Sequence, residues 1–408
     1  MATNFKKVDS SVMNKMNKIQ ILSIIHNEKT ISRADISKVT GLTPPTVTRI
    51  VEQLIHQEEL VKYVGIGDSN GGRPPMILSF NGSENFVIAI DLGATLIRGV
   101  LSDLNNDIQM EIQVNTDLEN GYEVIMDNVA IVIERLLNKR GLNRDKVLGV
   151  GLGVAGLIDR MKGTIDYSPD FGWEAVNISN SLHQRIKLPF ICDHVTRLMA
   201  LGELNYGLGK NYRNFAVIDI GYGIAAGIVV DGKLVYGSQG RAGEFGHFIV
   251  DPKSKIQCKC GSYGCLEALA SGRHIATLGK ELFSQKKSQT LTELCNNDIN
   301  AIDAKLVFEA ARAGDKHANK IVESVTNYLG IGIASLVNLL DPEVIFVGGG
   351  ISANGDIFIK PLKKTIQNFL ISRNRELDIK RVTFSDYATL TGAFSLIVEK
   401  IIRFESLT

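Results

Sequence analysis

The chain has 408 residues, a formal net charge of +1, and hydrophobic and charged fractions of 44% and 22%. These values are ordinary for a soluble globular protein, and the length leaves room for about two or three domains. No apolar run approaches the ~18–20 residues of a membrane span, and the polar residues 1–7 lack a signal-peptide pattern. We therefore expect a cytoplasmic protein with no membrane partner.

Three helical patterns open the chain, at about 13–27, 33–39 and 44–57. Ser32 can cap the second helix by accepting a hydrogen bond from the Asp35 amide. Gly41 can adopt the left-handed conformation that ends this helix. Thr43 then caps the third helix, and Pro44 suits its first position because no amide hydrogen bond is lost there. A short helix, a glycine turn and a further helix are typical of a helix-turn-helix motif.

The third helix has one apolar face and one polar face. Its apolar positions follow helical spacing and are Val47, Ile50, Val51, Leu54 and Ile55. A recognition helix presents its polar N-terminal side chains to the major groove. Together with flanking positions, the residues expected to contact operator DNA are Arg33, Thr43, Thr46, Thr48, Arg49, Gln53 and Arg73.

Two strands are expected to flank a wing, at 60–64 and 76–80. Arg73 can lie along a narrow minor groove, or residues 72–74 can form a plain turn between domains. We expect a winged helix-turn-helix domain with its linker over residues 1–80. The third helix is nearly neutral because the negative charge of Glu52 offsets the positive charge of Arg49. A neutral helix is unusual for binding DNA, so a three-helix packing module without a DNA partner is the alternative.

From residue 81 onward the pattern changes to buried strands and glycine turns. Strand pairs are expected at 86–101 and 216–229, and a further glycine turn at 344–350 follows a helical stretch at 317–340. An acidic residue followed by glycine in such a hairpin lets backbone amides approach phosphate or Mg²⁺. The repetition predicts a duplicated, two-lobe α/β body with a central cleft.

The most specific motif combines one histidine with three cysteines: His247, Cys258, Cys260 and Cys265. Three thiolates and an imidazole make the closed tetrahedral site that suits structural Zn²⁺. The odd total of five cysteines argues against a disulfide framework. Three free surface thiols beside an unrelated histidine are the alternative. Cys192 and Cys295 are expected to be ordinary packed residues.

Several motifs resemble the ROK family, named for repressors, open reading frames and kinases. They are Thr40-Gly41-Leu42-Thr43, Gly71-Gly72-Arg73-Pro74-Pro75, Gly243-Glu244-Phe245-Gly246-His247, Cys258-Lys259-Cys260-Gly261 and Gly264-Cys265-Leu266-Glu267. The resemblance covers nearly the whole chain and indicates the transcriptional repressor branch, which includes xylose and N-acetylglucosamine repressors. It implies an actin-like, hexokinase-like fold, with lobe I at 81–195 and 387–408 and lobe II, which holds the zinc-binding loop, at 196–386.

The resemblance also implies a sugar in the cleft. The implied sugar-binding residues are Gly156, Asp170, His194, Glu244, His247 and Glu267. His247 would use its other ring nitrogen for zinc, which fixes the tautomer and the ring orientation. Asp170 stands where the family usually has a sugar-contacting asparagine, and a surface turn is the alternative for this residue.

The same resemblance places Val195 where the family kinases have the aspartate that removes a proton from the sugar hydroxyl. Valine cannot accept a proton, and the loss of a general base typically lowers the rate by about 10²–10⁴. The two phosphate turns, at 93–95 and 221–225, carry bulkier residues than those of the kinases. Asp193 could replace the base only if it shared the face of Val195.

We therefore expect a sugar-responsive transcriptional repressor of carbohydrate utilisation genes, and no enzyme. Dimeric or tetrameric chains would bind operator DNA, and a small sugar or sugar-phosphate effector would change the closure of the lobes. An ATP-dependent sugar kinase with an attached DNA-binding head is one alternative. A regulator that answers mainly to a protein partner is another.

Overall fold

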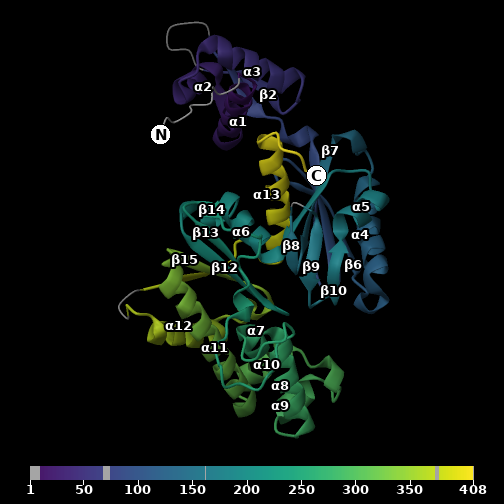
Figure 1. Cartoon of the computed structure of the whole chain (residues 1–408), viewed down its shortest axis with the longest axis vertical. Helices are drawn as coiled ribbons and strands as arrows, with labels where there is room; N and C mark the ends of the chain where they lie inside the picture. The colour runs from purple at the N-terminus through teal and green to yellow at the C-terminus, as the bar shows by residue number, and fades with distance from the viewer. Residues whose placement is uncertain (1–9, 68–73, 161, 373–375, 408) are drawn as a thin grey trace, which may run out of the picture.

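The computed structural model describes residues 10–67, 74–160, 162–372 and 376–407. A small head lies at one end of the molecule, next to the C-terminal helix, and a two-lobe body makes up the rest (Figure 1). The predicted fold class, a winged helix-turn-helix followed by an α/β two-lobe body, is therefore the observed one. Within the described part of the chain, no helix combines the length and the apolar character needed to cross a bilayer.

The head packs three helices against a small sheet. Its elements are α1 (Ser10–Glu28), β1 (Thr30–Ser32), α2 (Arg33–Thr40), α3 (Pro44–His56), β2 (Val61–Ile66) and β3 (Met76–Phe80). The antiparallel sheet has the order β1-β3-β2, so β2 and β3 form the predicted pair of wing strands. The sequence pattern does not predict β1, because three residues between two helices are too few to show an alternation.

The predicted ends of the head helices are mostly confirmed. Ser32 caps α2 by accepting the Asp35 N–H at 3.1 Å, and Gly41 ends it with φ of 70°. Thr43 does occupy the N-cap position of α3, but its side chain caps no amide. Its hydroxyl instead lies 2.9 Å from the Thr46 hydroxyl, so the two side chains satisfy each other. Thr43 is therefore the N-cap residue, as predicted, but it lacks the side-chain hydrogen bond that such a residue usually makes.

Lobe I is built on a five-stranded sheet with the order β11-β7-β4-β5-β6. Its strands are β4 (Phe86–Leu92), β5 (Leu96–Asp103), β6 (Ile108–Asn115), β7 (Val147–Val154) and β11 (Phe190–His194). A smaller antiparallel sheet contains β8 (Leu157–Asp159), β9 (Thr164–Ser168) and β10 (Trp173–Asn177), and the helices are α4 (Gly121–Leu137), α5 (Ile178–Arg185) and α13 (Ala388–Ile402). Strands β4, β5 and β6 are antiparallel neighbours, whereas β7 and β11 continue the sheet in parallel.

Lobe II repeats this plan with the strand order β14-β13-β12-β15-β16. Its strands are β12 (Phe215–Ile220), β13 (Ile224–Val230), β14 (Lys233–Leu234), β15 (Val344–Gly348) and β16 (Asp378–Arg381). Its helices are α6 (Val195–Asn205), α7 (Leu266–Ala270), α8 (Gly272–Ser284), α9 (Gln289–Leu294), α10 (Ala304–Arg312), α11 (Lys316–Leu340) and α12 (Asp356–Phe369). In both lobes an antiparallel hairpin is followed by a parallel strand, which confirms the predicted duplication.

The lobes meet where α6 crosses α13. The crossing is close because Gly392 has no side chain: a Cβ there would lie 1.8 Å from the Leu198 carbonyl oxygen. The head continues the same packed region, since Ile21 and Leu22 of α1 belong to one buried apolar cluster with Phe394 of α13. The head is therefore joined to the body by packing as well as by the chain.

Candidate functional site

A cavity of about 470 Å³ lies between the two lobes. Its walls include all six residues that the family resemblance assigns to a sugar, namely Gly156, Asp170, His194, Glu244, His247 and Glu267. The first three come from lobe I and the last three from lobe II, so the fold gathers them from both sides of the cleft. A pocket of this size with a few convergent polar groups is typical of a small-molecule site.

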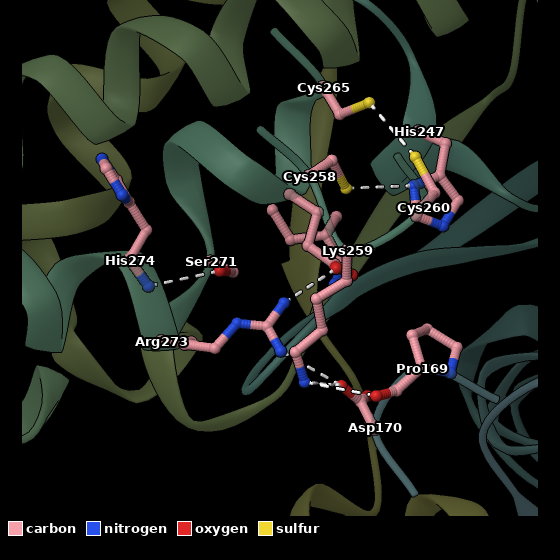
Figure 2. A network of polar contacts seen from close by, with 12 residues as sticks. Pro169, Asp170, His247, Cys258, Lys259, Cys260, Cys265, Ser271, Arg273 and His274 are labelled. Carbon is pink, nitrogen blue, oxygen red and sulfur yellow. Dashed lines mark hydrogen bonds and ion pairs between the residues drawn. The ribbon is translucent and has the colours of Figure 1, made fainter. Parts of the chain in front are cut away.

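The four predicted metal ligands come together beside this cavity (Figure 2). One ligand atom from each of His247, Cys258, Cys260 and Cys265 lies within 4.8 Å of the other three. Cys258 Sγ lies 3.6 Å from His247 Nδ1, and Cys260 Sγ lies 3.8 Å from Cys265 Sγ. Three sulfurs and one imidazole nitrogen at such distances fit a tetrahedral metal ion. The cluster could therefore hold a metal, and its soft donors suit zinc.

The loop that carries the cysteines depends on one glycine. Gly264 has φ of +71°, and a Cβ there would lie 1.9 Å from the Asp251 carbonyl oxygen. Only glycine allows this approach, which places Cys265 next to Cys260. Cys192 and Cys295 are buried free cysteines outside the cluster, as expected.

Glu244 is the N-cap of one turn of 3-10 helix, η5 (Phe245–His247), and His247 is the last residue of that turn. The Glu244 carboxylate lies 3.9 Å from His247 Nε2, the ring nitrogen opposite the one that faces Cys258. His247 can therefore hold a metal through Nδ1 and present Nε2 to the cleft. Burial raises the pKa of Glu244. Its side chain is 33% exposed and lines the cavity, so the carboxyl group can accept hydrogen bonds from the hydroxyl groups of a ligand.

His194 is the N-cap of α6, and its Nδ1 accepts the Thr196 N–H at 3.2 Å. Burial, and secondarily the nearby Arg197 charge, lower the pKa of His194 to about 3. The ring is therefore neutral at pH 7 with its proton on Nε2. A neutral imidazole in this tautomer can donate one hydrogen bond to a ligand oxygen.

Two cations that the sequence analysis did not identify pair with the carboxylates of the cleft (Figure 2). Arg273 Nη2 donates to Glu267 Oε1 at 3.1 Å, and Arg273 Nη1 lies 3.3 Å from Asp170 Oδ1. Lys259 Nζ lies 3.4 Å from the same Asp170 oxygen. Asp170 is therefore no isolated surface turn. An aspartate in place of a neutral asparagine was the available signal, because a poorly solvated carboxylate needs a cation nearby.

The head exposes most of the predicted DNA-contacting side chains. Thr43, Thr48 and Arg49 are exposed, whereas Thr46 and Gln53 are partly exposed. Arg49 donates to Asn14 Oδ1 at 2.6 Å and remains on the surface. Arg33 is only partly exposed, and its guanidinium contacts the Glu52 carboxylate and the Tyr63 hydroxyl at the surface of the head. Arg73 lies outside the described residues.

Two protein-family models match this chain. The model described as ROK family matches residues 87–400. The chain belongs to the ROK family. A model described as winged helix-turn-helix DNA-binding matches residues 17–57.

Both regulators and kinases resemble this ROK chain. A putative xylose repressor of Caldicellulosiruptor sp. (strain Rt8B.4) is 31% identical over 97% of this chain and 98% of its own. A glucokinase of Halalkalibacterium halodurans is 33% identical over 71% of this chain and 88% of its own. The crystal structure of a ROK family transcriptional regulator, a homolog of E. coli MLC protein, covers 96% of this chain and 97% of its own, with 25% identity and a TM-score of 0.81. A crystal structure of a ROK family glucokinase from Streptomyces griseus, in complex with glucose and AMPPNP, covers 76% of this chain and 99% of its own, with 29% identity and a TM-score of 0.69.

In this ROK chain the residue expected at the position of the catalytic base does line the cleft. Val195 is the first residue of α6 and forms part of the cavity wall, whereas Asp193 is not among the described residues that line it. The Asp193 carboxylate accepts from Arg197 Nε at 2.7 Å and lies 3.3 Å from Arg160 Nε. Asp193 therefore does not share the face of Val195, and the structure contradicts its rescue of the base.

A second cavity, of about 270 Å³, continues the cleft beside the phosphate turns. Asp91 and Asp219 line both cavities. Burial raises the pKa of Asp91 to about 7, with the Asp219 charge as a further cause, and burial raises the pKa of Asp219 to about 6. Tyr222, which follows the second hairpin strand, places its ring 5.0 Å from the Arg273 guanidinium. An aromatic ring therefore lies in the second of the two turns that the family resemblance assigns to phosphate, close to a cation of the cleft.

Proposed function

We propose that this ROK chain is a sugar-responsive transcriptional repressor, which binds operator DNA through its head and a sugar through its cleft. One observation carries the proposal. The cavity gathers six residues suited to a sugar, and its wall also contains Val195, the residue that the family resemblance aligns with the proton acceptor of the kinases. The match of a xylose repressor of Caldicellulosiruptor bescii to 97% of the chain, head included, supports the same function.

The chemistry of the cavity favours an uncharged polyol. Asp170, Glu244 and Glu267 are acceptors for hydroxyl protons, and neutral His194 supplies a donor. Gly156, with φ of +141°, lets the backbone approach a ring closely. Vicinal hydroxyls of a sugar both donate and accept, so they can satisfy this mixed set.

Zinc at the four-residue cluster would hold the wall of the cleft. It would be bound by His247 Nδ1 and the three thiolates, and its charge would stabilise those thiolates. The ion would fix the orientation of the His247 ring, so that Nε2 faces the sugar beside Glu244. We assign the metal no chemical step.

Two copies of the chain would present two heads to the half-sites of a pseudo-palindromic operator. Sugar binding would then alter the relative position of the heads through the closure of the lobes. Such coupling commonly amounts to about 1–3 kcal/mol, or roughly 5–150-fold in operator affinity. Sedimentation of the free protein and of the operator complex would establish whether dimers or tetramers bind.

Operator binding and sugar response can be measured together. Full-length protein would first select its binding sites from a random duplex library. The affinity for the selected site would then be measured by gel shift with D-xylose, D-glucose and N-acetylglucosamine, each with and without a 6-phosphate where the sugar allows it. We expect one of these compounds to change the affinity at least fivefold, and Glu267→Gln to abolish that change. Arg185→Met, which removes the two ion pairs of Arg185 with Glu123 and Asp127 in lobe I, is the control.

A sugar kinase with a regulatory head is the second candidate, because a glucokinase matches the body and two aspartates, Asp91 and Asp219, line both cavities of the cleft. This function requires ADP release with ATP and a sugar. We expect none above the rate without sugar, because Val195 accepts no proton. Sugar-dependent ADP release would overturn the assignment of a pure regulator. If the protein shows neither a sugar response nor ADP release, a regulator controlled by a protein partner would be the remaining alternative.

A further inference from the structure

A buried ion pair lies directly behind the sugar cavity. Arg197 Nε donates to Asp193 Oδ1 at 2.7 Å, and the two side chains are only 2% and 1% exposed. Arg160 Nε lies 3.3 Å from the second Asp193 oxygen. Both guanidinium groups also lie over the Tyr236 ring, at 4.4 Å for Arg160 and 5.9 Å for Arg197. Burying such charges is unfavourable unless hydrogen bonds satisfy them, so the remaining donors of Arg197 are important.

Those donors cross from α6 to a loop of lobe II. Arg197 Nη1 donates to the carbonyl oxygen of Gly240 at 2.9 Å and lies 3.4 Å from that of Ala242. The chain continues directly into Gly243 and Glu244. A charge-assisted donor therefore holds the backbone two residues before a carboxylate that lines the cavity.

The other side of this loop is fixed by strand β13. The Ala226 N–H donates to the Gly243 carbonyl oxygen at 2.9 Å. Gly243 has φ of +100°, and a Cβ there would lie 2.0 Å from the Ala226 carbonyl oxygen. The backbone between Ala242 and Glu244 thus lies between β13 and the Arg197 guanidinium, and little freedom remains for the direction of the Glu244 side chain.

A second contact also reaches this loop, but it is weaker. Arg241 Nη2 lies 2.8 Å from Asp166 Oδ2 of lobe I, and the two side chains are 49% and 44% exposed. Exposed ion pairs contribute little because water competes for both groups. The buried donor of Arg197 is therefore the contact that can fix the loop.

We propose that Arg197 is a positioning residue that directs Glu244 into the sugar cavity, with Asp193 orienting its guanidinium. The inference rests on the proposed function, because Glu244 counts as a sugar ligand only there. Neither Arg197 nor Asp193 is among the described residues that line the cavity, so both act through the loop. Asp193 and Arg197, each two positions from Val195, thus serve the binding of the sugar and not a chemical step on it.

The first test needs no ligand. Backbone hydrogen exchange of the full-length protein would be followed at Ala242 and Phe245, whose amides donate to the carbonyl oxygens of Tyr236 and Gly243. We expect Arg197→Met to accelerate exchange there roughly tenfold, because local opening becomes easier. Arg197→Lys should lie between that variant and the unmodified protein. Arg241→Met should change the rates much less. Loop rates unchanged by Arg197→Met, or a larger effect of Arg241→Met, would show that the inference is wrong.

Arg197→Met leaves a buried carboxylate without its partner, and this variant could fail to fold. The double variant Asp193→Asn with Arg197→Met removes both charges together, which is far better tolerated. Exchange in α4, on the other side of lobe I, and the metal content would report whether the fold is intact. If Arg197→Met does not fold, the exchange rates of the double variant alone test whether Arg197 fixes the loop.

The second test measures the consequence for the sugar. The chain has one tryptophan, Trp173, and its ring stacks 4.5 Å from Phe171, which lines the cavity. Its fluorescence would follow titrations with D-xylose and D-glucose. We expect the double variant to bind roughly tenfold more weakly, with unchanged operator affinity and metal content. If the unmodified protein binds neither sugar, induction by D-xylose and D-glucose fails, and the exchange rates still decide the role of Arg197. Faster loop exchange with unchanged sugar affinity would refute the direction of Glu244 by Arg197.

Discussion

Arg273 and Asp170 form an ion pair across the mouth of the cleft, with Nη1 3.3 Å from Oδ1. Asp170 belongs to the turn between β9 and β10 of lobe I, whereas Arg273 lies in the first turn of α8 in lobe II. Lys259, from the loop of the metal cluster, reaches the same carboxylate. One carboxylate therefore connects the sugar cavity, the metal loop and the opposite lobe.

Asp170→Asn should weaken sugar binding and leave the fold nearly unchanged. A charged acceptor forms a stronger hydrogen bond with a hydroxyl than a neutral amide does, and the difference is about 1 kcal/mol, or roughly fivefold in affinity. The lost ion pairs are partly exposed, so the free energy of unfolding should fall by no more than about 1 kcal/mol. Titration followed by Trp173 fluorescence and urea unfolding would measure both. Asp166→Asn, on the same small sheet, is the matched control, and an equal loss of affinity there would contradict a specific role for Asp170.

Cys260→Ser should remove the metal and loosen the cleft. Zinc bound by four protein ligands would be present at about one equivalent in the unmodified protein and well below that in the variant. Lys259 lies between two of these ligands, and its carbonyl oxygen accepts the Tyr167 hydroxyl of lobe I at 3.1 Å. Loss of the metal should therefore also weaken sugar binding. Elemental analysis would check the first effect, with Cys295→Ala as the control. Unchanged metal content in Cys260→Ser would refute the assignment of the ligands.

Asp91 should make stability depend on pH in a defined direction. Its folded pKa of about 7 lies above the ordinary value of 3.8, because burial and then the Asp219 charge favour the protonated form. The stability that this group contributes is complete below pH 3.8 and is lost as the pH rises through about 7.

Asp91→Asn removes this dependence. The difference in unfolding free energy between the variant and the unmodified protein should therefore grow in favour of the variant as the pH rises from 5 to 8. The gain is at most about 3 kcal/mol, because one pKa unit corresponds to about 1.4 kcal/mol and the group keeps some solvent contact. Urea unfolding at the two pH values would measure it. Parallel stability profiles for both proteins would contradict a raised pKa of Asp91.

Two arginines of the head should behave differently when each is replaced by alanine. Arg49 is exposed on α3, so Arg49→Ala should weaken operator binding by about 1–3 kcal/mol if it reads a base. If it contacts a phosphate, the salt dependence should lose about one unit of slope. Arg33→Ala should instead destabilise the head by about 1 kcal/mol, because its partners are Glu52 and Tyr63. Gel shifts across salt concentrations and thermal unfolding would separate these effects. Equal effects of both variants on affinity alone would place Arg33 at the DNA as well.

Local signals in the sequence were sufficient for much of this protein. Helix caps act over three or four residues, so Ser32 and Gly41 indicated the ends of α2 correctly. The metal cluster could be predicted because three of its ligands lie within eight residues, a spacing that is typical of metal-binding loops. The duplicated hairpins were visible as repeated strand and glycine patterns. The limits drawn at residues 80, 195 and 386, and the individual roles of the sugar and DNA residues, stay predictions.

Only the tertiary structure decided which charges pair. Asp170 meets Arg273 from 103 positions away, and Arg33 meets Tyr63 across 30. Asp193 was a candidate base in the sequence, but the structure turns it toward Arg197 and leaves Val195 in the cavity wall. The reason is physical: a side chain's type determines which charges it can neutralise, whereas packing determines which charges lie near enough to do so. The sequence by itself therefore indicated the family and the four residues of the His/Cys cluster, whereas only the fold decided which charged side chains bridge the two lobes across the cleft.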